Sequence, residues 1–65
     1  MTTTITVEGM SCGHCEQTVE DALRGVDGVT DATADREGNR ASVDGDADVG
    51  ELVRAVEDAG YTAHA

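Results

Sequence analysis

The sequence predicts an α+β fold with the element order βαββαβ, in which both helices cover one face of a four-stranded antiparallel sheet. Apolar residues alternate with polar ones over three short segments, which is typical of half-buried strands. Over two longer segments they recur at the spacing of an amphipathic helix. The chain has 65 residues and no proline or linker, so we expect one domain over residues 1–65.

The first strand and the first helix are expected on either side of a glycine loop. Thr4–Glu8 alternates, with Ile5 and Val7 on the buried face, and Gly9–Gly13 forms the loop. From Cys15 the apolar residues share one side of a helix: Cys15, Val19, Ala22, Leu23 and Val26. The opposite, solvated side is expected to carry Glu16, Glu20 and Asp21.

A hairpin is expected next. Val29–Asp35 forms the second strand, with Val29 out of phase, which indicates a bulge or a shifted entry into the strand. Gly38–Asn39 predicts a two-residue turn with Glu37 and Arg40 facing one another across it. A short third strand, containing Ala41 and Val43, follows the turn.

The last third of the chain predicts a second helix and a short strand. Asp48 and Glu51 form a plausible capping pair at the start of the helix. Its apolar residues continue at helical spacing, and Gly60 ends it. Tyr61–Ala65 is long enough for a final strand. The uncovered face of the sheet would then be polar and solvated.

The composition excludes several classes of function. Fourteen acids and four arginines, with no lysine, give a net charge of −10, so phosphate binding and nucleic-acid partners are not expected. No segment approaches the roughly 20 apolar residues of a membrane span, and the first residues do not resemble a secretory signal. We therefore expect a cytoplasmic protein without membrane insertion, too small for an enzyme pocket.

The chemistry lies in Met10-Ser11-Cys12-Gly13-His14-Cys15. Cys15 falls in or near the first turn of the helix, where unpaired N–H groups stabilise a thiolate, and Gly13 gives Cys12 the freedom to swing towards it. Two soft thiolates on a short bridge suit Cu(I), which accepts a low coordination number. Structural zinc requires four ligands, and the chain has no second cysteine pair.

The glycine-flanked loop Gly9–Cys15 resembles that of the heavy-metal-associated domain, in particular of small single-domain prokaryotic copper chaperones. Two further segments share the likeness, Gly25–Val29 before the second strand and Ala59–Tyr61 before the last, so the resemblance covers essentially the whole chain. It implies a ferredoxin-like fold, Cu(I) bound by Cys12 and Cys15, and transfer to the metal-binding domain of a copper-transporting P-type ATPase. Met10 would then point inward and hold the loop, and Tyr61 would lie beside it. The absence of lysine departs from the family pattern and leaves the docking electrostatics open.

Other interpretations remain open. A CxxC pair is also found in thiol–disulfide oxidoreductases, although this chain is short for a thioredoxin core and has no Trp or Pro. The same pair could serve a scavenger or sensor of Hg, Cd, Ag or Zn. His14 and Met10 are possible third ligands, but we assign His14 to the solvated surface and Met10 to packing. The sequence does not decide between a monomer and two chains that share one metal ion.

The acidic composition also predicts a dependence on salt. An Asp-rich, lysine-free surface with a net charge of −10 is typical of proteins that work in a salty interior. At about 1 M salt the screening length is roughly 3 Å, so the carboxylates cease to repel one another. We expect the free energy of unfolding, measured with urea, to be higher at high salt than at low salt. Equal stability in both conditions would contradict this prediction.

Overall fold

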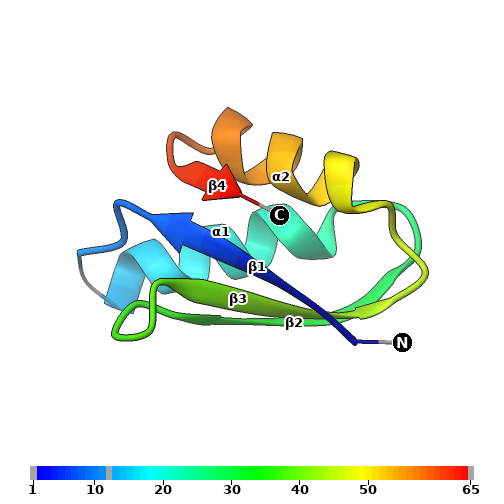
Figure 1. The fold of residues 1–65 in the computed structure, drawn as a ribbon, viewed down its shortest axis with the longest axis horizontal. Helices are drawn as coiled ribbons and strands as arrows, with labels where there is room; N and C mark the ends of the chain where they lie inside the picture. The colour runs from blue at the N-terminus through cyan, green and yellow to red at the C-terminus, as the bar shows by residue number, and fades with distance from the viewer. Residues whose placement is uncertain (1, 12, 65) are drawn as a thin grey trace.

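The computed structural model describes residues 2–11 and 13–64. Its elements follow the predicted βαββαβ order (Figure 1): β1 (Thr2–Glu8), α1 (Gly13–Arg24), β2 (Val29–Asp35), β3 (Arg40–Gly45), α2 (Val49–Asp58) and β4 (Thr62–His64). The four strands form one antiparallel sheet in the order β2-β3-β1-β4, so β1 and β3 are interior strands. This ferredoxin-like α+β fold confirms the predicted class. Within the described ranges no helix is long and apolar enough to cross a membrane.

The core lies between the sheet and the two helices and is built from small and medium-sized side chains. The strands contribute Ile5, Val7, Ala32, Ala34, Ala41, Val43 and Ala63. The helices contribute Val19, Leu23, Leu52 and Val56, and the loop after β1 contributes Met10. Because several inward strand positions are alanine, the Val and Leu side chains of the helices can approach the sheet closely.

The sheet begins earlier than the sequence indicates. β1 starts at Thr2 rather than Thr4, because Thr2 and Thr3 pair with Asp44 and Val43 of β3. The Thr2 hydroxyl also donates to Asp44 Oδ1 over 2.6 Å. Strand pairing uses backbone groups, so a run of polar threonines joins a ladder without any apolar alternation.

The hairpin between β2 and β3 corrects the predicted two-residue turn. Asp35 pairs with Arg40, which leaves a four-residue loop over 36–39, and Glu37 does not face Arg40. Asn39 adopts the left-handed region with φ of 52°. At the other end of β2 the register shifts between Val29 and Asp31, which confirms the predicted irregularity at the start of this strand.

The helix boundaries show one agreement and one difference. Asp48 is the N-cap of α2, as predicted, and its side chain accepts from the Gly50 amide over 3.3 Å. α1 begins at Gly13, so the predicted loop Gly9–Gly13 is one residue too long. The three-residue strand β4 pairs with the end of β1, Thr6 to Glu8.

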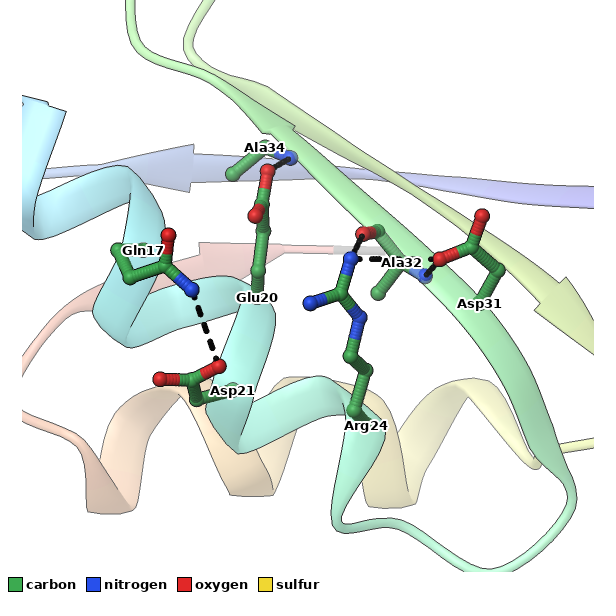
Figure 2. A network of polar contacts seen from close by, with 7 residues as sticks. All are labelled: Gln17, Glu20, Asp21, Arg24, Asp31, Ala32 and Ala34. Atoms are coloured by element: carbon green, nitrogen blue, oxygen red, sulfur yellow. Dashed lines mark hydrogen bonds and ion pairs between the residues drawn. The ribbon is translucent and has the colours of Figure 1, made fainter.

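Side chains of α1 reach the outer edge of β2, which corrects the assignment of Glu16 and Glu20 to the solvated side. Glu16 Oε2 accepts from the Arg36 amide over 2.7 Å, and Glu20 Oε2 accepts from the Ala34 amide over 3.0 Å. Arg24 Nη2 donates to the Ala32 carbonyl over 3.0 Å (Figure 2). Both glutamates are half-buried. An edge strand otherwise presents such backbone groups to other chains, so this row of bonds satisfies them within the molecule.

Gly45, at the end of β3, provides a test of the backbone geometry. It has φ of +124°, and a Cβ there would collide with the carbonyl oxygen of Gly28 and lie 3.0 Å from the Thr30 amide. Gly45→Ala should therefore lower the free energy of unfolding by more than about 1 kcal/mol in urea denaturation.

Gly50→Ala is the matched control, because Gly50 lies inside α2 and the nearest atom to an added Cβ is 3.9 Å away. It should stabilise the protein by about 0.4–1 kcal/mol. If Gly45→Ala unfolds at the same urea concentration as the unmodified chain, the backbone at the end of β3 is not constrained in this way.

Candidate metal centre

The candidate metal loop joins β1 to α1, at the end of the molecule where the β2–β3 hairpin also turns (Figure 1). Of the two predicted ligands, Cys15 is described, whereas Cys12 lies outside the described residues. Among residues 2–11 and 13–64, no three His, Cys, Asp or Glu side chains gather as a metal-binding group. The geometry of the candidate centre is therefore built from Cys15 and the residues that support the loop.

Cys15 occupies the first turn of α1. Its side chain is half-buried and packs against the core. The first-turn amides of a helix have no intrahelical partner and form its positive end, which favours an anionic sulfur there. The Ser11 hydroxyl lies 3.9 Å from Cys15 Sγ, within the range of a weak hydrogen bond to sulfur. Sulfur and serine thus face one another across the loop.

Met10 fixes the loop to the protein interior. It lies outside the helices and strands, yet its side chain is only 7% exposed and belongs to the apolar core. A flexible thioether fills irregular space well, so this residue can pack between the sheet and the helices at the point where the chain leaves β1. The side chain therefore anchors the residues that precede Cys12.

Tyr61 lies against the start of the loop, next to Gly9. It is half-buried and packs against the core, and its backbone amide donates to the Val56 carbonyl over 3.2 Å. A Cβ added to Gly9 would lie 3.6 Å from Tyr61 Cδ1, so the ring covers the first residue of the loop. Gly9 itself has φ of +99°, a conformation that glycine adopts without strain.

Gly13 and His14 are both exposed at the start of α1. No atom lies within 4 Å of a Cβ added to Gly13, so close packing does not require glycine there. The His14 carbonyl accepts from the Thr18 hydroxyl over 3.0 Å, a bond within the helix. The His14 side chain is therefore at the surface, where the sequence analysis assigned it.

Two residues near the site were missed by sequence reasoning. Ser11 precedes Cys15 by four residues, a spacing that indicates proximity at a helix start. Glu16 is expected on the solvated side from its helical position, but its carboxylate binds the hairpin. Glu16 precedes Glu20 by four residues and Arg24 by eight, so all three lie on one side of the helix. This shared side was the signal in the sequence that they could contact the same strand.

Burial of Met10 leads to a prediction about stability. Met10→Ala removes a core side chain and should lower the free energy of unfolding by about 2–5 kcal/mol. Met10→Leu preserves most of the volume and should cost less than about 1.5 kcal/mol. Urea denaturation measures both values. If Met10→Ala keeps the original stability but loses binding of Cu(I), then Met10 is a ligand and not a packing residue.

Comparison with known proteins places the chain in a family. The pattern of the heavy-metal-associated domain matches residues 4–62. The chain is 47% identical over 60 residues to the copper chaperone CopZ of Staphylococcus aureus, with 88% of each protein covered. A solved CopZ metallochaperone is 42% identical with a TM-score of 0.92, covering 98% of this chain and all 100% of the other. A copper binding domain from HMA7, a P-type ATPase, is 35% identical with a TM-score of 0.93, covering 97% and 89%. This chain belongs to the heavy-metal-associated domain family.

Proposed function

We propose that this protein is a Cu(I) metallochaperone that carries one ion between the sulfurs of Cys12 and Cys15. The observation that carries the proposal is the position of Cys15, in the first turn of a helix and three residues after a second cysteine. A relative named as a copper chaperone, 47% identical, and one named as a metallochaperone, 42% identical, support the same cargo over most of the chain.

The donor set favours Cu(I) over other ions. Thiolates are soft ligands and select Cu(I), which two sulfurs can satisfy in a near-linear arrangement. Zn(II) at a structural site takes four ligands, and the sequence supplies only one cysteine pair. The positive end of α1 offsets part of the negative charge that two thiolates bring to one ion.

Delivery follows from the same low coordination number. A thiolate of the partner forms a third bond to the ion, and the bond to Cys12 then breaks. A second thiolate of the partner next binds the ion, and the bond to Cys15 breaks last. Each new copper–sulfur bond forms before an old one is lost, so no free ion is released. Binding also displaces a proton from any thiol that is not already ionised.

The partner is proposed to be a domain of the same kind in a copper-transporting P-type ATPase. Structural similarity to the copper binding domain of a P-type ATPase supports such a pairing between similar folds. A disulfide between Cys12 and Cys15 would block loading, so the protein belongs in a reducing compartment, and we place it in the cytoplasm. The proposed role is that of a carrier rather than an enzyme.

Replacement of either sulfur tests the site. Cys12→Ser and Cys15→Ser should each weaken Cu(I) binding by more than roughly 100-fold. Losing a residue that only hydrogen-bonds a metal ligand costs up to about 100-fold in affinity, and losing the ligand itself should cost more. Both variants should remain folded, as judged by circular dichroism. The measurement is competition of the metal-free protein with a strong Cu(I) chelator under reducing conditions.

His64→Ala is the control for this experiment. His64 lies in β4 and pairs with Glu8 over 3.2 Å at the surface, so its loss should leave the Cu(I) affinity unchanged. A cysteine variant that still competes with the chelator would refute the two-sulfur site. The same titration with Ag, Hg, Cd and Zn ranks the alternative cargoes, and insulin reduction by the metal-free protein would instead indicate a redox enzyme.

A further inference from the structure

We infer that Glu16 is a positioning residue for the metal loop: its carboxylate holds the first turn of α1, and with it Cys15, on the β2–β3 hairpin. The inference rests on the proposed function in that it treats Cys15 as a copper ligand. The bond itself is a property of the metal-free protein and can be measured without copper.

The hairpin is bonded to both flanks of the candidate metal loop. Before the loop, the Val7 amide of β1 donates to the Asn39 carbonyl over 2.8 Å. After the loop, the Arg36 amide donates to Glu16 Oε2 over 2.7 Å. The first and last residues of one four-residue turn therefore hold the strand that leads into the loop and the helix that leads out of it.

Glu16 is one member of a regular row, together with Glu20 and Arg24, so its bond is not an isolated surface contact. Four residues of helix rise about 6 Å, and two residues of strand advance about 6.6 Å. The three side chains consequently stay in register with backbone groups of every second residue from Ala32 to Arg36, along the edge of β2 and into the turn that follows it. Figure 2 shows the two members farther from the loop.

Packing alone holds the first turn of α1 weakly. The fully buried side chains described in α1 are Val19 and Leu23, which lie beyond that turn. Gly13 and His14 are exposed, and Cys15 is half-buried. A hydrogen bond from a backbone amide to a carboxylate is stronger than one between neutral groups. The bond of Glu16 therefore contributes directly to the position of the turn that carries Cys15.

Charge and position have opposite effects on copper binding, which allows them to be separated. Removing the negative charge next to Cys15 should favour the anionic copper–dithiolate centre and strengthen binding. Releasing the turn should weaken binding, because the two sulfurs are less well held. Glu16→Gln removes the charge but keeps an oxygen acceptor, whereas Glu16→Ala removes both.

The first measurement is amide hydrogen exchange in the metal-free, full-length chain by NMR. Glu16→Ala should raise the exchange rate of the Arg36 amide roughly tenfold, and Glu16→Gln should raise it less. Asp21→Ala is the matched control, since it removes a carboxylate from the same helix. The Asp21 carboxylate accepts from Gln17 and does not bind the hairpin in the described bonds. This variant should leave the exchange rate of the Arg36 amide unchanged. An unchanged rate in Glu16→Ala would overturn the inference.

The second measurement is chelator competition for Cu(I) under conditions in which all variants are folded. Glu16→Ala should bind at least roughly threefold more weakly than Glu16→Gln, because only the acceptor distinguishes them. Equal affinities for these two variants would overturn the positioning role. If the unmodified chain does not bind Cu(I), the proposed function fails, and the Arg36 exchange rates alone uphold or overturn the bond that Glu16 makes.

Discussion

The structure depends on a small apolar core that has to hold the candidate metal loop in place, and no aromatic side chain is fully buried in its described part. The core has neither Phe nor Trp, and its largest fully buried side chains are Ile5, Leu23 and Leu52. The hydrophobic effect scales with buried apolar area, so a core of this size yields a small net stability. Met10 is important for this reason. Its buried side chain enlarges the core and at the same time anchors the loop two residues before Cys12.

Hydrogen bonds between side chains of α1 and backbone groups add to the stability that the small core provides. The row of α1 side chains on β2 ties a helix to an edge strand through backbone groups, whose positions do not depend on side-chain size. The same bonds occupy donors and an acceptor that an edge strand would otherwise offer to a second chain. In contrast, the ion pair of Arg24 with Asp31 is solvated and spans 3.3 Å, so it adds little by itself.

The sequence was sufficient to predict the features that follow from apolar periodicity, which are the element order and the buried faces of the strands and helices. Alternation located Ile5 and Val7 on the buried face, and the phase error at Val29 located the bulge. Periodicity records burial, however, and not hydrogen bonding. It therefore missed the pairing of Thr2 and Thr3, the length of the turn before Arg40, and the contact of Glu16 with the hairpin. At the site, the motif predicted which sulfurs to examine, but the distance of Ser11 from Cys15 required the fold.

A carrier of this kind must keep its sulfurs accessible and still hold them in place. Burying the loop would satisfy the second requirement and prevent the first, since a partner thiolate must reach the ion. In the described part of the chain, residues on both sides of the candidate cysteines are held by packing or hydrogen bonds, and several neighbours of the cysteines are exposed. Val7 and Met10 are held on the β1 side and Glu16 on the α1 side, whereas Ser11, Gly13 and His14 are exposed. Because residues on both sides of the cysteines are already held, the free-energy cost of ordering them when a partner docks is small.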